Sequence, residues 1–343
     1  DLKWERTGQF DIGLDLGLFN NRLRITTDYY KKKTTDLLYS VAVPATSGYQ
    51  TMLKNIGSIE NQGYELSIES DNLTGAFSWT TAFNIAFNRN KVLELGGEEY
   101  KEMAEGDGHL KTGSVRRLIV GEPIGVFYGY RFDGIFQNEE ECKQQTSSAS
   151  PIGVGLRRYK DLNGDGKVDA ANDREILGDA NPKFFGGLTN TFAYKGFELN
   201  VFLQYSYGNK ILNYNAMELE NPTGGQNAYA DMVNRWTPEN PSNIYPKATT
   251  NRALLVSDRF IEDGSYLKLK TLSLSYSFPK INLKHIQGLR LYVTGQNLLT
   301  WTKYRGYDPE VSYRGASTLE AGEDFGGYPQ SRTFMFGIKL DIK

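Results

Sequence analysis

Every second residue is apolar along the last ten residues of the chain, and the residues between them are mostly charged or small. The apolar phase consists of Phe334, Phe336, Ile338, Leu340 and Ile342. The other phase carries the charges, with Lys339, Asp341 and Lys343. Successive side chains of a β-strand point to opposite faces of the sheet. The segment therefore predicts a strand with one face in an apolar environment and the other in water.

The same alternation recurs upstream, between turn signals. The predicted strands lie at about residues 10–18, 23–29, 64–69, 77–88, 110–120, 126–132, 188–194, 197–207, 267–278 and 289–296. Alternation is poor at 110–120, which is counted because the order of the connections requires it. Leu267 and Leu269 fall on the opposite phase from Leu272 and Leu274, which predicts a bulge or a rise out of the apolar band. With the terminal segment, the pattern predicts eleven antiparallel strands.

The connections between these strands alternate in length. Short links lie near residues 20, 73, 122, 196 and 283, and long polar segments lie at about 38–60, 90–109, 137–183, 209–264 and 301–330. Outer-membrane barrels have short periplasmic turns and long extracellular loops. The predicted chain therefore begins outside the membrane and ends in the periplasm. An open strand edge cannot face lipid, because its backbone groups would be unpaired, so eleven strands predict one part of a larger barrel.

Composition narrows the choice of class. Hydrophobic residues make up 39% of the chain, and no run approaches the roughly 18 apolar residues of a spanning helix. Aromatic residues make up 13%, which favours β-structure. A soluble sandwich also alternates apolar and polar residues, but the second phase here is too hydrophilic for a packed sandwich centre. A net charge of -2 gives no reason to expect nucleic acid as a partner.

Seven short motifs occur in order along almost the whole chain. They are Leu2-Lys3-Trp4-Glu5, Phe87-Asn88-Arg89-Asn90-Lys91-Val92, Gly121-Glu122-Pro123-Ile124-Gly125 with Tyr128-Gly129-Tyr130, Asp161-Leu162-Asn163-Gly164-Asp165-Gly166, Asp263-Gly264-Ser265-Tyr266-Leu267, Gly295-Gln296-Asn297-Leu298 and Gly306-Tyr307-Asp308-Pro309-Glu310. In this order they resemble the SusC/RagA-type TonB-dependent transporters of Bacteroidetes outer membranes. Each motif is weak alone, and their order makes the set specific.

The resemblance implies an all-β transmembrane barrel of 22 strands, of which residues 1–343 would form the carboxy-terminal half. The family's plug, amino-terminal extension and TonB box match nothing in the chain, and the usual terminal aromatic is replaced by Lys343. The implied function is active import of oligosaccharides or oligopeptides across the outer membrane, by a transporter and not an enzyme. The implied partners are a SusD-like surface lipoprotein, the TonB–ExbB–ExbD complex and the glycan or peptide cargo, with transporter–lid pairs forming a dimer.

Residues 161–169 match the first nine positions of a calcium-binding loop. The predicted ligands are Asp161, Asn163, Asp165, the carbonyl of Lys167, Asp169 and Asp173. Gly166 occupies the sharp turn, and Asn172 stands where a bidentate acid is expected, so Asp173 serves only if the loop holds one extra residue. The sequence predicts a structural Ca²⁺ that rigidifies an extracellular loop. A metal-free turn rich in Asp, Asn and Gly is the alternative.

Other chemistry has weaker support. The acids at 98–99 and 139–141 lie in loops without an apolar pocket, which disfavours a glycosidase pair. His109, His285 and Cys142 form neither a zinc set nor a catalytic triad. Two alternatives remain, a soluble calcium-stabilised carbohydrate-binding or adhesin domain and a surface hydrolase.

Aromatic and polar strand residues complete the predictions. An interfacial girdle is predicted from Trp79, Tyr276, Phe278 and Trp301. Cargo stacking is a possible role for the loop residues Tyr214, Tyr229, Trp236 and Tyr245. The transport path is predicted to be lined by Arg24, Glu65, Asn84, Gln204 and Arg290.

Overall fold

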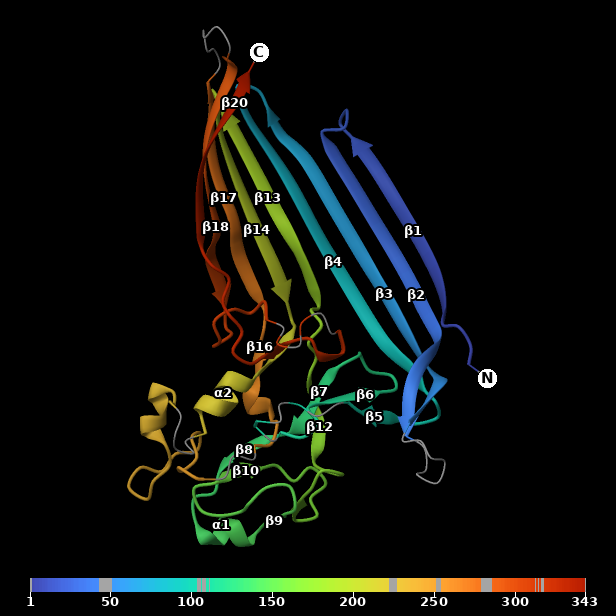
Figure 1. Cartoon of the computed structure of the whole chain (residues 1–343), viewed down its shortest axis with the longest axis vertical. Coiled ribbons are helices and arrows are strands. Elements are labelled where there is room, and N and C mark those ends of the chain that lie inside the picture. The colour runs from blue at the N-terminus through green and yellow to red at the C-terminus, as the bar shows by residue number, and fades with distance from the viewer. Residues whose placement is uncertain are drawn as a thin grey trace.

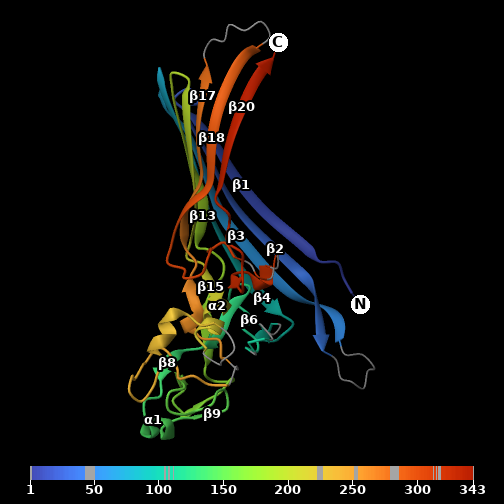
Figure 2. The same cartoon turned by 60° about the vertical axis from the view of Figure 1, so that its left-hand side comes forward.

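Nine long antiparallel strands form one curved sheet (Figures 1 and 2). The computed structural model describes residues 2–42, 51–103, 106, 109–110, 112–221, 227–250, 254–278, 286–311, 313, 315 and 318–342. Across the sheet the strands are β1 (Arg6–Leu18), β2 (Leu23–Ala42), β3 (Thr51–Thr74), β4 (Phe77–Leu95), β13 (Phe184–Tyr194), β14 (Phe197–Tyr207), β17 (Tyr266–Phe278), β18 (Ile286–Thr302) and β20 (Thr333–Ile342). Each strand pairs with the next one in this order, so the sheet is a barrel wall without crossovers.

The predicted count of eleven strands in this wall is wrong, although the predicted class of an antiparallel membrane sheet is confirmed. Residues 110–120 and 126–132 instead contribute β6 (Arg116–Ile119) and β7 (Val126–Tyr130) to a separate four-stranded sheet, of order β12-β7-β6-β5. These strands are four and five residues long, whereas a tilted membrane strand needs about 9 to 11. The long polar segment predicted at 38–60 is also wrong, because β2 ends at Ala42 and β3 begins at Thr51. The other long connections still lie between β4 and β13, between β14 and β17 and between β18 and β20, with short links between them.

The long connections fold into a compact loop region at one end of the wall (Figure 1). We define the loop region as residues 96–183, 208–265 and 303–332. Its remaining elements are β5 (Tyr100–Glu102), β8 (Phe132–Ile135), α1 (Glu139–Lys143), β9 (Thr146–Ser147), β10 (Arg157–Tyr159), β11 (Lys167–Val168), β12 (Arg174–Gly178), β15 (Lys210–Asn213), α2 (Tyr214–Leu219), η2 (Ala230–Asn234), η3 (Asp258–Phe260), β16 (Ile261–Asp263), η4 (Thr318–Glu320) and β19 (Glu323–Asp324). No helix in the described part of the chain has the length and apolar character needed to cross a membrane.

The hydrophobic core lies in the loop region and not in the wall. One buried cluster joins residues from two of the long connections, namely Leu110, Val115, Phe127, Leu177, Leu212, Tyr214, Ala216, Met217, Leu254, Val256 and Phe260. A three-stranded sheet in which β15 pairs with β16 and β19 brings in the third connection. The connections are therefore packed into one folded body that can hold side chains in fixed positions.

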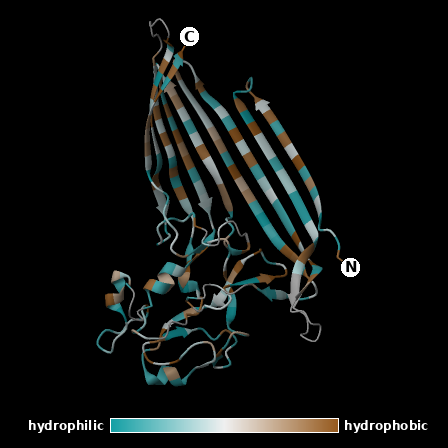
Figure 3. Ribbon diagram, viewed as in Figure 1, coloured by the Kyte–Doolittle hydropathy of each residue, from teal (hydrophilic) through white to brown (hydrophobic). Residues whose placement is uncertain are grey.

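Hydrophobic and hydrophilic residues alternate along the long strands of the wall (Figure 3). Their phase puts the apolar residues on one face, and two rows of aromatic residues bound that face. Phe77, Tyr194, Phe197 and Tyr276 are aligned across four strands near the short turns. Tyr29, Tyr64 and Phe87 are aligned across three strands near the loop region, and the Phe87 ring lies 5.8 Å from that of Phe184. Ten residues separate the rows along β4; at about 3.4 Å per residue and a tilt of about 40°, they span about 26 Å. This matches the apolar band of about 25 Å on outer-membrane barrels.

A bulge interrupts the register between β17 and both of its neighbours. Leu269 pairs with Leu299 whereas Thr271 pairs with Gln296, so Lys270 is extra on β17 and Asn297 and Leu298 are extra on β18. Asn297 has a positive φ of 52°. The bulge predicted from the reversed phase of Leu267 and Leu269 is therefore confirmed, and it turns Lys268 to the face opposite the apolar one.

Candidate functional site

The second face of the wall is polar, and its charges are paired across strands. Arg24 lies 2.9 Å from Glu69, and Arg290 lies 2.5 Å from Glu198. Asn84 Oδ1 accepts a hydrogen bond from the amide of Gly187. The five residues predicted to line a path, Arg24, Glu65, Asn84, Gln204 and Arg290, all have the strand phase of this face. The wall therefore separates an apolar exterior from a polar interior.

A buried ion cluster fixes the third long connection to the interior of the wall. Lys268 is 1% exposed, and its Nζ lies 2.6 Å from Asp308 and 2.5 Å from Glu310. Lys270 Nζ lies 2.9 Å from Glu310, and the Tyr266 hydroxyl donates to the same carboxylate at 3.1 Å. Burial disfavours the charged form of Glu310, but hydrogen bonds and charges from the two lysines outweigh it and lower the pKa of this carboxyl. Two motifs that are about 40 residues apart in the sequence thus meet in one contact.

Two further motifs meet where β4 enters the loop region. The amide of Val92 donates to the Glu122 carbonyl at 2.9 Å, and the Gly121 amide returns a bond to the Val92 carbonyl at 2.8 Å. Asn90 Oδ1 accepts from the Ile124 amide at 2.6 Å. Gly121 has a φ of 96°, a conformation that favours glycine. These contacts tie the loop-region end of β4 to the first long connection.

Buried arginines hold the loop region together, and the sequence patterns did not single them out. Arg116 is 2% exposed and lies 2.9 Å from Glu323, which is 207 residues away in the chain. Glu220 is 1% exposed, and its carboxylate lies 2.6 Å from Arg259 and 2.8 Å from Arg305. The partners are 39 to 207 residues apart, and two of the three pairs join separate connections, so a single sequence carries no signal of them. Buried charges need such partners to offset the loss of hydration.

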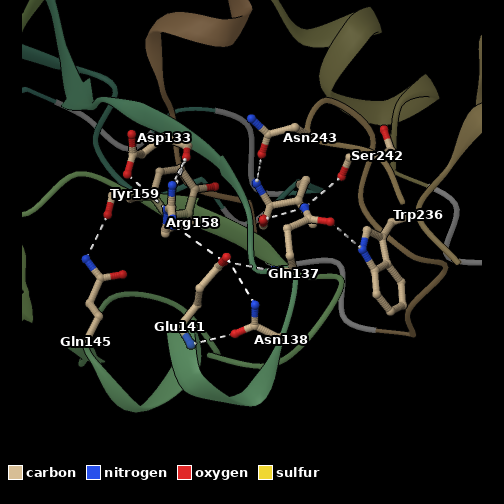
Figure 4. Close-up of polar contacts among 11 residues, drawn as sticks. Asp133, Gln137, Asn138, Glu141, Gln145, Arg158, Tyr159, Trp236, Ser242 and Asn243 are labelled. Carbon is tan, nitrogen blue, oxygen red and sulfur yellow. Dashed lines mark hydrogen bonds and ion pairs between the residues drawn. The ribbon is translucent and has the colours of Figure 1, made fainter. Parts of the chain in front are cut away.

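Polar contacts also fix the surface around α1 (Figure 4). The side-chain amide of Gln137 donates through Nε2 to the Ser242 carbonyl at 3.1 Å and accepts through Oε1 from Trp236 Nε1 at 3.1 Å. The Glu141 carboxylate accepts a hydrogen bond from the main-chain N–H of Gln137 at 2.9 Å and lies 3.5 Å from Arg158. Trp236, one of the predicted stacking residues, is therefore oriented by its indole N–H.

Unlike Trp236, Tyr214 does not lie where a cargo molecule could reach it. Tyr214 is fully buried in the core, so it cannot stack on a cargo molecule. Tyr229 packs against the same core and is partly buried, and the Tyr245 hydroxyl lies 3.3 Å from Asp231. Burial raises the pKa of both of these hydroxyls. Of the predicted girdle, the Tyr276 ring lies 4.5 Å from Phe197 and 4.8 Å from Phe278, Trp79 stacks on Phe192 at 5.8 Å, and Trp301 is exposed. The girdle stays a prediction.

The predicted calcium ligands lie together in one turn, where they bind main-chain amides. Asp161 accepts from the amides of Gly164 and Gly166, each at 2.7 Å. Asp173 is fully buried and accepts from the amides of Leu162 and Asp169, also at 2.7 Å. In the described part of the chain, no three His, Cys, Asp or Glu side chains converge as a metal site. The oxygen-only donors suit Ca²⁺, and calcium binding stays a prediction.

Asn163, Asp165, Lys167 and Asp169 complete this turn. Asn163 Oδ1 accepts from the Asp165 amide at 3.1 Å, and Asp165 Oδ1 accepts from the Lys167 amide at 2.8 Å. Asp169 accepts from the amides of Ala171 and Asn172, and these bonds, together with the Lys167 ammonium, lower the pKa of its carboxyl. Each oxygen of Asp161 and Asp173 accepts one main-chain bond and retains a second lone pair, so these bonds and a metal are compatible, whereas Asp169 Oδ1 accepts two.

The other groups weighed for catalysis have surface partners. Glu98 lies 3.3 Å from Lys101, and His109 lies 3.5 Å from Glu218. Asn138 caps α1 by accepting from the Glu141 amide at 2.9 Å. Cys142 is a half-buried free thiol, and His285 lies outside the described residues. These contacts are those of ordinary surface charges and a helix cap.

Comparison with known proteins identifies the family to which this two-faced wall belongs. Residues 1–298 match the family described as TonB dependent receptor-like, beta-barrel. The chain belongs to the TonB-dependent receptor β-barrel family. Members of this family reside in the outer membrane, which places the short turns on the periplasmic side and the loop region outside the cell.

Relatives within this family have the SusC/RagA character that the motifs predicted. TonB-dependent receptor P3 of Formosa agariphila is 41% identical over 99% of the chain, which covers 34% of that protein. TonB-dependent receptor SusC of Bacteroides thetaiotaomicron is 30% identical over 100% of the chain, which covers 32% of that protein. The RagAB peptide importer in its open-open state has a TM-score of 0.79 and 26% identity, covering 99% of this chain and 35% of its own. This chain therefore spans about a third of the length of these relatives.

Proposed function

We propose that the protein to which this chain belongs imports oligopeptides or oligosaccharides across the outer membrane, with energy supplied through TonB. The two-faced wall carries this proposal. An apolar exterior about 26 Å wide fits the membrane, and an interior of paired charges suits a hydrated path. The family and its location support the same reading.

The similarity to the RagAB peptide importer supports peptides as one candidate cargo. RagAB, which matches 99% of the chain at 26% identity, is described as a peptide importer. A polar interior also accommodates sugars, so peptide and glycan cargo are the two candidates. A SusD-like surface lipoprotein is the proposed lid over the loop region. The TonB–ExbB–ExbD complex would act on the plug, and transporter–lid pairs would assemble as dimers.

Uptake in living cells tests this function. We expect a labelled oligopeptide mixture or a labelled oligosaccharide to accumulate in cells that carry the full-length gene. Cells without this gene, or without TonB, should take up at least tenfold less. Uptake that persists without the gene would contradict the proposal. Recovery of the full-length protein as a soluble monomer without detergent would favour the calcium-stabilised binding domain instead.

We propose further that residues 161–173 bind a structural Ca²⁺. Titration calorimetry of full-length protein with CaCl₂ tests this binding directly. Asp161→Asn removes the charge of the first ligand and should weaken binding at least tenfold. Glu140→Gln removes an exposed acid in α1 outside the loop and should leave binding unchanged. Absence of binding heat, together with identical melting curves in calcium and in chelator, would contradict the proposal.

A further inference from the structure

A cavity of about 200 Å³ lies in the loop region between β10 and the second long connection. Its lining combines polar and apolar side chains, and the apolar ones include Leu156, Leu254 and Leu255. Arg157, Tyr159 and Asn221 are the polar residues at its wall that bear on its chemistry. Pockets for whole small-molecule ligands are usually about 300 to 1,000 Å³. This cavity is therefore of a size to receive one end of a longer molecule.

Arg157 is a buried cation without a carboxylate partner in the described part of the chain. The residue is 8% exposed, and its Nη2 donates to the main-chain carbonyl of Glu220 at 3.0 Å. Its Nε is buried and has no hydrogen-bond acceptor among the described residues. The Glu220 carboxylate is already held by Arg259 at 2.6 Å and Arg305 at 2.8 Å. The Arg157 guanidinium thus contacts the main chain of Glu220, while the Glu220 carboxylate is paired with Arg259 and Arg305.

The surroundings make this arrangement costly in the absence of a ligand. Burial, and the charge of Arg259, lower the pKa of the Arg157 guanidinium, although Tyr159 and Glu220 oppose this effect. Asn221, at the same wall, is 8% exposed, and its Oδ1 is buried without a donor among the described residues. Buried ions and amides in folded proteins are normally satisfied. Two incompletely satisfied groups beside one cavity indicate that a ligand completes their contacts.

We infer that this cavity receives the carboxylate-bearing end of the cargo, with the carboxylate on Arg157 and an apolar group against the leucines. A planar guanidinium binds carboxylates with two parallel hydrogen bonds, which explains the choice of arginine. Asn221 Oδ1 is an acceptor and would take a hydrogen bond from an amide N–H next to that carboxylate. A carboxylate, an adjacent N–H and an apolar side chain together describe the last residue of an apolar peptide. This inference rests on the proposed import function and deepens it.

Calorimetry on detergent-solubilised full-length protein tests the inference with three probes. The first is a five-residue peptide ending in leucine, the second is the same peptide with a carboxy-terminal amide, and the third is a glucuronate-containing disaccharide. We expect the peptide acid to bind at least tenfold more tightly than the amide. Preference for the disaccharide over the peptide acid would assign the carboxylate to a sugar acid and overturn the peptide end.

Two neighbouring arginines of β10 provide a matched pair of variants. Arg157→Gln should abolish the difference between peptide acid and amide, with the amide affinity nearly unchanged. Arg158→Gln is the control, because Arg158 lies 2.9 Å from Asp133 and 3.5 Å from Glu141, away from the cavity (Figure 4). It should keep the full difference.

The possible failures are distinguishable. Wild-type protein that binds acid and amide equally, or binds neither, overturns the inference without any variant, so misfolding of Arg157→Gln cannot hide it. Import of peptides would still stand in that case, since uptake is measured separately. Loss of TonB-dependent uptake for every peptide and glycan would instead overturn the function on which the inference rests.

Discussion

Individual buried charges decide how the loop region is held on the wall. Lys268, with two carboxylates within 2.6 Å, connects the third long connection to β17. Arg116 joins the first long connection to the third through Glu323, and Glu220 joins the second to the third through Arg305. Removing one member of such a set leaves an uncompensated charge, which costs far more than loss of a surface pair. Single substitutions at these positions should therefore have large and specific effects.

Lys268→Met is expected to lower the free energy of unfolding by about 3 kcal/mol, because it leaves Asp308 and Glu310 close together without their shared cation. Urea unfolding of the full-length protein in lipid vesicles measures the loss. Lys31→Met is the control, since Lys31 lies 3.1 Å from Glu60 on a half-exposed part of the same sheet and should cost less than about 1 kcal/mol. Equal losses for the two variants would show that the cluster is not an anchor.

Acid should release the same contact. The pKa of Glu310 is lowered in the folded state, so its charge stabilises the fold above its ordinary value of 4.5, and this contribution disappears as the pH falls through the lowered value. We expect protease cleavage within residues 303–332 to increase as the pH drops from 5 to 3. Glu310→Gln should make cleavage less dependent on pH, while Glu239→Gln, at an exposed acid, should retain the wild-type profile. An unchanged profile for Glu310→Gln would contradict this assignment.

At the scale of elements, the sequence predicts strands only where lipid faces one side. The alternating pattern predicted only residues 64–69 of β3, whereas the strand runs from Thr51 to Thr74. The first half of β3 lacks the apolar phase, because strand positions beyond the aromatic row have no lipid to face. The segment at 126–132 was misassigned because strands of a sheet outside the membrane can show the same pattern, and the segment at 110–120 was counted only because the order of the connections required it. They form β7 and β6, short strands of the loop region.

The candidate site was less predictable than the strands. The calcium turn is contiguous in sequence, so its composition revealed it. Arg157 and its cavity depend on contacts between β10, residue 221 and residues 254–255, which are far apart along the chain. A single sequence carries no record of such long-range pairing. The motifs did identify Asp308 and Glu310 as important, and the structure supplies their partner, Lys268.

The terminal strand β20 offers a direct test of the two faces. Phe336 is 82% exposed on the apolar face, and Met335 beside it has the phase of the interior. Phe336→Arg should reduce the free energy of folding into lipid vesicles by about 2 to 4 kcal/mol, because a charge would then face hydrocarbon. Met335→Arg should cost less than half as much. A larger cost at Met335 than at Phe336 would reverse the assignment of the faces.

At the scale of the whole molecule, the described wall is open along both sides. Within the nine-stranded sheet, β1 pairs only with β2, and β20 pairs only with β18. Unpaired backbone groups in hydrocarbon cost several kcal/mol each, so a membrane barrel must close. The relatives are about three times as long as this chain, and they contain the additional sequence from which closing strands would come.

The 343-residue chain expressed alone is therefore expected not to give a folded membrane species, whereas the full-length protein should. Refolding both into lipid vesicles and comparing gel mobility with and without boiling distinguishes them, because a closed barrel resists SDS until heated. Protease digestion of the vesicles gives a second measurement, since strands in a closed wall are protected. Adding the missing part of the protein as a separate chain should restore resistance by pairing β1 and β20 with new neighbours. A monomeric 343-residue chain that resists both SDS and protease would mean that nine strands close on themselves, and the proposed larger barrel would be wrong.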